Sequence, residues 1–129
     1  MGADIYIFTK KEPDFTGIDP EIVVREENSS WYFRDPYNGY SLAWVIGLSY
    51  GREFMEDPAD FLEQLSRITD EQIERYAREQ LVEEELVLVG ETEVKVKCDV
   101  NYFLRRAKLR RDYLRRLVEA GIVEVEYAL

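Results

Sequence analysis

Alternation of apolar and polar residues predicts most of the strands in this chain. From Ala3 to Thr9, Ile5 and Ile7 share one face and Tyr6 lies on the other. Apolar bulk on both faces is typical of a central strand. The predicted strands span residues 3–9, 21–25, 86–89, 93–98 and 122–129, and the third and fourth form a hairpin around a glycine.

Apolar residues at helical spacing predict the helices. Asp57, followed by Pro, is a start signal, and Thr69 opens a segment with the spacing of a capping box. Asp99 or Asn101 would cap the last helix, and Gly121 would end it. The predicted helices span residues 41–50, 58–68, 70–81 and 101–120.

The order of these elements indicates the fold class. About five short strands and about four helices follow one another out of strict βαβ order, which favours α+β over a doubly wound fold. With 129 residues, the chain has the usual length of one domain. We therefore expect residues 1–129 to form a single compact domain, with a mostly antiparallel sheet packed by the helices.

The segment 31–54 combines aromatic residues, an Arg-Asp pair, a turn and the most apolar run of the chain. Residues 35–39 (DPYNG) predict the turn, because Pro fixes φ and Asn-Gly tolerates positive φ. A charge beside a core needs a partner, so Arg34 and Asp35 have two interpretations. They form a structural ion pair next to a capped helix, or they belong to a polar ligand pocket over an apolar floor. The pocket residues would be Arg34, Asp35, Tyr37 and Asn38.

The apolar run itself, residues 42–48, has no polar side chain. We expect the helix 41–50 to be buried on most sides, with Ser41 or Asn38 as its cap. Gly47 in the middle of that helix would cost roughly 1 kcal/mol relative to Ala, which predicts a close packing contact at this position.

Charge is distributed unevenly along the chain. The formal net charge is −10, and residues 53–93 contain 14 acidic and 3 basic residues. A row of carboxylates on the helices between residues 58 and 85 could bind a basic groove on a partner, or it could serve only solubility. The candidate residues of this acidic face are Asp57, Asp60, Glu63, Asp70, Glu71 and Glu74.

The last predicted helix carries three Arg-Arg pairs. On a helical wheel, Arg105, Arg111 and Arg115 lie opposite the apolar stripe, where they could contact nucleic-acid phosphates. The acidic total disfavours that role. Arg106 and Arg110 fall within the apolar stripe or at its edge, so we expect them to snorkel or to pair with carboxylates of the acidic helices.

The composition excludes several kinds of chemistry. No histidine is present, so zinc sites and Ser-His or Cys-His triads are excluded. Cys98 is the single cysteine, and the alternating run around it predicts a buried apolar side chain. Glu56, Asp57 and Asp60 could hold a hard cation, but such clusters are expected by chance among 27 acidic residues. We therefore expect no catalysis, no cofactor and no metal.

The cellular location follows from what the sequence lacks. No apolar run approaches the ~20 residues needed to span a bilayer, and no signal-like segment opens the chain. We expect a soluble, cytoplasmic protein without a membrane partner. Abundant Glu and Arg with few Asn, Gln and Cys is the pattern of a thermophilic source.

Two segments resemble a group of short phage and bacterial proteins. Those proteins open with Met-Gly-x-Asp-x-Tyr and carry a Tyr-Phe-Arg-Asp-x-Tyr-Asn block before an apolar helix. The resemblance covers roughly the first 50 residues and implies a phage-like origin, with no activity attached to it. The matching positions are Gly2, Asp4, Tyr6, Tyr32, Phe33, Arg34, Asp35, Tyr37, Asn38, Leu42 and Trp44.

Charge and resemblance together favour a phage-encoded protein that binds, and inhibits or modulates, a host macromolecule through its acidic face. A nucleic-acid-handling machine, such as RNA polymerase or a defence complex, would offer a basic groove. Two alternatives stay open. One is a small-ligand-binding domain that uses the Arg34–Asn38 corner, and the other is nucleic-acid binding by the Arg-rich last helix.

Overall fold

The computed structural model describes residues 2–22, 24–36, 40–81, 84–97 and 99–129, and it contains a four-stranded antiparallel sheet. Its strands are β1 (Gly2–Thr9), β2 (Glu26–Glu27), β3 (Ser30–Pro36) and β6 (Ile122–Ala128), in the order β2-β3-β1-β6. The central position predicted for the first strand is confirmed, and so is the strand predicted after Gly121. The mixed α+β class with a mostly antiparallel sheet is confirmed as well.

Side-chain alternation gives this sheet one buried face. Ile5 and Ile7 of β1 and Phe33 of β3 are buried there, and Asp35 is the polar member of the same set. The register places Ile5 opposite Phe33, so the apolar side chains of the two strands meet across the ladder. The other face carries Asp4, Tyr6, Tyr32 and Arg34, which belong to the segments that resemble the phage proteins.

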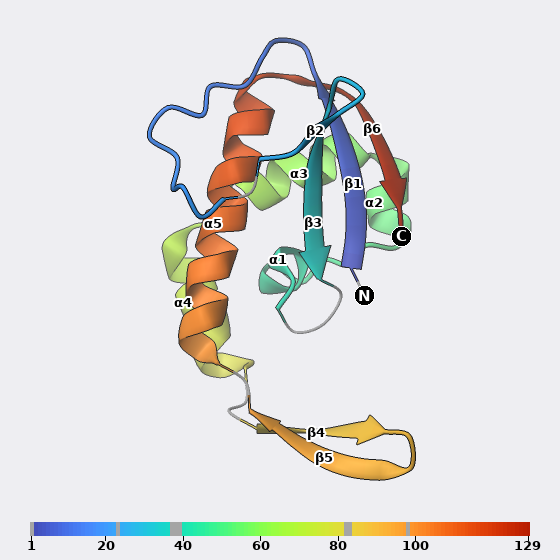
Figure 1. Ribbon diagram of the computed structural model, residues 1–129, viewed down its shortest axis with the longest axis vertical. Coiled ribbons are helices and arrows are strands. Elements are labelled where there is room, and N and C mark those ends of the chain that lie inside the picture. The colour runs from blue at the N-terminus through green and yellow to red at the C-terminus, as the bar shows by residue number, and fades with distance from the viewer. Residues whose placement is uncertain (1, 23, 37–39, 82–83, 98) are drawn as a thin grey trace.

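The helices lie together on one side of the sheet and cover its buried face (Figure 1). They are α1 (Leu42–Val45), α2 (Arg52–Glu56), α3 (Pro58–Ser66), α4 (Asp70–Glu79) and α5 (Val100–Glu119). Both α3 and α4 pack against the long helix α5, and α3 also contacts β6. Within the described residues, every helix is too short or too polar to cross a membrane.

The predicted starts of three helices are confirmed. The Asp57 side chain accepts a hydrogen bond from Asp60 N at the start of α3, and Thr69 and Gln72 form a reciprocal capping box at α4. Asp99 caps α5, which ends just before Gly121. Local capping chemistry therefore sets these boundaries as the sequence predicts.

The predicted helix 41–50 is wrong in length. Ser41 caps α1, as expected, but this helix ends at Val45, and Trp44 is 46% exposed. Gly47 has φ +73° and ends the helix by adopting a left-handed turn conformation. The predicted close packing at Gly47 is also wrong, because a Cβ built there meets nothing within 4 Å.

The strand predicted at 21–25 is wrong, and a longer strand that the pattern missed follows it. Asp19 accepts hydrogen bonds from Glu21 N at its side chain and from Ile22 N at its carbonyl, so a local turn replaces extended pairing. Pairing resumes in the short strand β2, and a tight turn at Asn28 and Ser29, both with positive φ, leads into β3.

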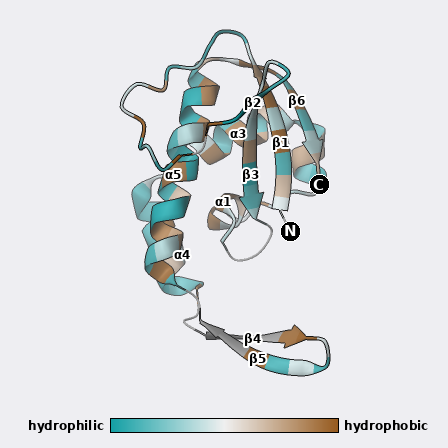
Figure 2. Cartoon of the chain, viewed as in Figure 1, coloured by the Kyte–Doolittle hydropathy of each residue, from teal (hydrophilic) through white to brown (hydrophobic). Residues whose placement is uncertain are grey.

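The predicted hairpin is confirmed as β4 (Glu84–Val89) and β5 (Thr92–Lys97), with Gly90 in the turn at φ +66°. It projects away from the sheet and helices (Figure 1). The end of β4 is apolar (Figure 2), with Leu88 69% exposed, whereas the turn that follows it is polar. Cys98 and the prediction made for it lie outside the described residues.

Candidate ligand-binding site

Arg34 and Asp35 are neighbours in sequence but lie on opposite faces of β3. Arg34 is exposed, and its Nη1 donates to Asp4 Oδ1 at 2.6 Å, directly across the β1–β3 ladder. The Tyr32 hydroxyl donates to the same carboxylate oxygen. That hydrogen bond, with the nearby Arg34 charge, lowers the pKa of Asp4. The resembling residues Asp4, Tyr32 and Arg34 are thus one cross-strand cluster.

Asp35 is fully buried and connects β3 to α1. Its carboxylate accepts hydrogen bonds from Ser41 Oγ at 2.8 Å, Leu42 N at 3.0 Å and Tyr50 Oη at 2.9 Å. Burial raises the pKa of Asp35, and the facing Arg110 charge together with these donors limits the rise. The predicted structural role therefore holds only in part: Asp35 accepts hydrogen bonds at the start of α1, but Arg34 is not its ion-pair partner.

The cationic partner of Asp35 is Arg110 of α5. Arg110 Nε lies 3.4 Å from Asp35 Oδ1, and Arg110 Nη2 donates to the carbonyl of Tyr40 at 2.7 Å. The prediction that Arg110 pairs with the acidic helices is wrong, because its carboxylate comes from the sheet. Burial lowers the pKa of Arg110, the Asp35 charge opposes this, and the Arg106 charge one turn away adds to it.

A hollow of about 230 Å³ opens between β3 and this part of α5, and we call it the arginine hollow. Apolar and aromatic side chains form part of its lining, and four arginines from three segments of the chain also line it. Among the described residues, no carboxylate lines it. The lining residues are Ile22, Arg25, Tyr32, Phe33, Arg34, Arg106, Leu109, Arg110 and Tyr113.

The rings in the arginine hollow are held in place. Tyr113 donates its hydroxyl to the carbonyl of Tyr32 at 3.0 Å, which fixes the α5 side of the hollow to β3. The Arg25 guanidinium lies 5.0 Å above the centre of the Tyr32 ring, in a cation–π arrangement. Arg25 also pairs with Glu27, Arg34 with Asp4 and Arg110 with Asp35, so three of the four cations are already partly neutralised.

A second hollow of about 230 Å³ adjoins the first, and we call it the aromatic hollow. Arg106 and Arg110 line both hollows, so the two share a wall. Within the part of the chain that the structure describes, this lining also lacks carboxylates. The lining residues are Pro36, Tyr40, Tyr102, Phe103, Arg106 and Arg110.

The arginines predicted to contact nucleic acid are occupied elsewhere. Arg111 is 4% exposed, so the prediction that it lies on the solvent side of the helix is wrong. Its guanidinium lies 2.5 Å from Asp70 and donates to the carbonyl of Ile68 at 3.2 Å. Arg115 donates to the carbonyls of Ser66 and Ile68. Both guanidiniums thus bind carbonyl groups at the C-terminal end of α3 or just after it, where a helix dipole favours cations.

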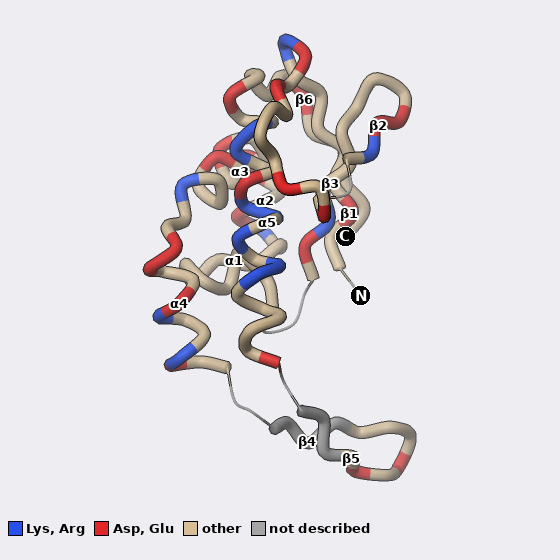
Figure 3. The backbone as a smooth tube through the Cα atoms, turned by 60° about the vertical axis from the view of Figure 1, so that its left-hand side comes forward, with Lys and Arg blue, Asp and Glu red and all other residues tan. Residues whose placement is uncertain are grey.

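The acidic face is exposed, and much of it is paired within the chain. Glu63 and Glu71 pair with arginines one turn ahead, whereas Glu74 pairs with Lys108 of α5 at 3.0 Å. The third arginine of the predicted set, Arg105, pairs with Glu21 in the loop before β2. Basic positions follow the length of α5, and acidic positions lie mainly on the surrounding elements (Figure 3). Partner binding by this face stays a prediction.

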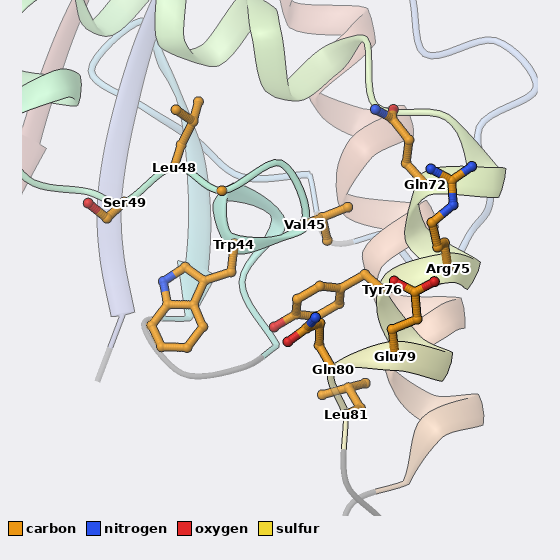
Figure 4. Close-up of a pocket in the computed structure, with 11 residues that line it drawn as sticks. Trp44, Val45, Leu48, Ser49, Gln72, Arg75, Tyr76, Glu79, Gln80 and Leu81 are labelled. Carbon is orange, nitrogen blue, oxygen red and sulfur yellow. The ribbon is translucent and has the colours of Figure 1, made fainter.

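A wider groove of about 660 Å³ separates α1 from α4. Trp44 and Tyr76 come from opposite sides of it, with Leu81 at the same end, while Gln72 and Arg75 lie farther along α4 (Figure 4). Arg75 pairs with Glu71, and Glu79 also lines the groove, so the lining contains both signs of charge. The charged residues of this groove therefore differ in sign, whereas those of the arginine hollow are all basic.

The structure places only part of the predicted polar pocket. Tyr37 and Asn38 lie outside the described residues, and the side chains of Arg34 and Asp35 point to different sides of β3. Across the described ranges, no group of three or more Asp, Glu, Cys or His residues is placed to hold a metal ion. Comparisons with protein-family models, curated proteins and solved structures found no match to this chain.

Proposed function

We propose that the protein is a binding domain for a small anionic ligand, which occupies the arginine hollow. The observation that carries the proposal is that Arg25, Arg34, Arg106 and Arg110 all line one small hollow, together with apolar and aromatic residues. Concave, mostly apolar sites with a few converging polar groups are the usual form of a ligand site. Here the charged residues of the lining are all arginines, although the chain as a whole has a net charge of −10.

The charges around Arg106 support an anion rather than a neutral ligand. Within the described residues Arg106 has no hydrogen-bond or ion-pair partner, and its charge lies beside that of the buried Arg110. Arg106 and Arg110 bring two positive charges, and Asp35 supplies one negative charge. A further negative group would therefore stabilise the two guanidiniums. The planar guanidinium fork suits carboxylate and phosphate oxygens, because it can donate two parallel hydrogen bonds.

The test is isothermal titration calorimetry with pyrophosphate as the probe. The wild-type chain should bind one equivalent of it, and R106Q should weaken binding at least about tenfold, because a charge-assisted hydrogen bond is lost. R105Q is the matched control: Arg105 precedes Arg106 on α5 but pairs with Glu21 and does not line the hollow. Equal binding by both variants, or no binding by wild type, would remove the proposal.

A second candidate function is partner binding through the acidic face. A phage-encoded protein would use this face to bind a basic groove of a host nucleic-acid-handling machine in an infected cell. The supporting observation is that Asp57 and Asp60 are exposed, beside a shallow hollow lined by Val118 and Ile122. A pull-down from host lysate at two salt concentrations tests it. Salt-sensitive capture that is lost in D57N/D60N supports the idea, whereas salt-independent capture contradicts it.

A further inference from the structure

The two adjoining hollows carry a more specific inference about the ligand, which rests on the proposed function. We propose that the ligand is a nucleoside phosphate, with its phosphate in the arginine hollow and its base in the aromatic hollow. The inference combines the chemistry of each hollow with the residues that they share.

The shared wall places the two halves of such a ligand next to each other. Arg106 and Arg110 are four residues apart on α5, so their side chains lie on the same face of the helix, one turn apart. Each contributes to both linings. If these two guanidiniums bind a phosphate in the arginine hollow, the rest of the same molecule can extend into the aromatic hollow. The ligand therefore has an anionic end and a second end of different chemistry.

The second end is defined by the rings of the aromatic hollow. Tyr102 is 60% exposed, so its ring is accessible to a ligand, whereas Phe103 is buried and forms the floor. The Tyr40 and Phe103 rings lie 5.9 Å apart, which keeps Tyr40 against that floor. Exposed aromatic rings bind nucleobases by stacking, and arginines at the edge add cation–π attraction.

Size separates this ligand from a simple anion. Inorganic phosphate would occupy the arginine hollow and leave the aromatic hollow empty. A sugar phosphate would place hydroxyl groups in the aromatic hollow. These groups suit its lining poorly, because the lining consists mainly of aromatic rings and Pro36. The two hollows together fall at the lower end of the roughly 300–1,000 Å³ typical of small-molecule sites. A nucleoside monophosphate supplies both the charge and the flat ring.

Calorimetry on the full chain distinguishes the ring from the phosphate. The probes are the 5′-monophosphates of adenosine, guanosine, cytidine and uridine, with ribose 5-phosphate and pyrophosphate as ring-free references. We expect at least one nucleotide to bind about tenfold more tightly than ribose 5-phosphate, since base stacking on a protein ring has this magnitude. Y102A should abolish that difference and leave pyrophosphate binding unchanged.

W44A is the matched control, because Trp44 is an exposed aromatic residue in the separate groove between α1 and α4. It should leave nucleotide binding unchanged. Loss of nucleotide affinity in W44A but not in Y102A would overturn the assignment by moving the base to that groove. If no nucleotide exceeds ribose 5-phosphate while pyrophosphate still binds, the nucleoside assignment fails and the anion site stands. If no probe binds, both proposals fail.

Discussion

Two arginine pairs on α5, each four residues apart, have opposite surroundings. Arg111 and Arg115 face the C-terminal end of α3, where backbone carbonyls and Asp70 accept their hydrogen bonds. Arg106 and Arg110 lie near the end of β3, where Asp35 pairs with Arg110, whereas Arg106 has no ion-pair partner among the described residues. Identical residues on one helix therefore differ in role because of what packs opposite them. The first pair is structural, and the second is the pair to which we assign ligand binding.

The largest effect is expected from removing the carboxylate that holds Arg110. D35A leaves a buried guanidinium without its charge partner and removes the acceptor for Ser41 and Tyr50. The free energy of unfolding should fall by about 3 kcal/mol, as measured by urea denaturation. The double variant D35A/R110M should recover part of that loss, because it also removes the uncompensated charge. A loss under about 1 kcal/mol in D35A would contradict the buried-pair description.

The next effect concerns the structural pair. R111M keeps an apolar stem but removes the donor for the Ile68 carbonyl and the partner of Asp70. Urea denaturation should show a loss of about 2 kcal/mol. R105M serves as the control and should change stability little, because the Arg105–Glu21 pair is exposed. Equal losses in both variants would show that burial does not distinguish the two positions.

The ligand-facing pair should behave in the opposite way. R106Q removes a charge that faces Arg110 and has no partner among the described residues, so the free energy of unfolding should stay within about 0.5 kcal/mol of wild type. Pyrophosphate binding should nevertheless be weakened. A variant that loses stability and binding together would make Arg106 another structural arginine and would erase the contrast with Arg111.

The smallest effect is on carboxyl titration. Hydrogen bonds and ion pairs lower the pKa of Asp4 and Asp70 below 3.8, whereas burial raises that of Asp35 above it. Stability contributed by Asp4 and Asp70 is therefore present above pH 3.8 and is lost as the pH falls through their lower folded-state pKa values. Asp35 contributes with the opposite sign. Carbon NMR of the side-chain carboxyls checks this order, which a pKa of Asp35 below that of Asp4 would refute.

Much of the fold was predictable because its signals are local. Asp57 with Pro58, the Thr69 capping box and Gly121 each act within one turn of helix, so α3, α4 and the end of α5 follow from the sequence. The strand β3 was missed because one of its inward positions is occupied by Asp35, which interrupts the expected alternation. Asp35 is stable in the core because Ser41, Leu42 and Tyr50 donate hydrogen bonds to it and Arg110 pairs with it. No local sequence pattern reveals these contacts.

The site was predictable only in part, for the same reason. The helical wheel correctly singled out Arg106 and Arg110 as charges on an apolar stripe, and Arg34 belonged to the predicted polar corner. These three arginines line one hollow only because β3 packs beside α5, and the sequence does not reveal that packing. Tyr102 carried no signal, because an exposed tyrosine on a helix is unremarkable until the neighbouring hollow is known.

The most direct measurement is an NMR titration that follows the guanidinium Nε–H signals of the α5 arginines while pyrophosphate is added. Saturable shifts of the Arg106 and Arg110 signals, with the Arg111 and Arg115 signals unchanged, are the predicted result, because only the first pair lines the arginine hollow. No shift in any of the four signals, or equal shifts in all of them, would contradict a specific anion site between β3 and α5.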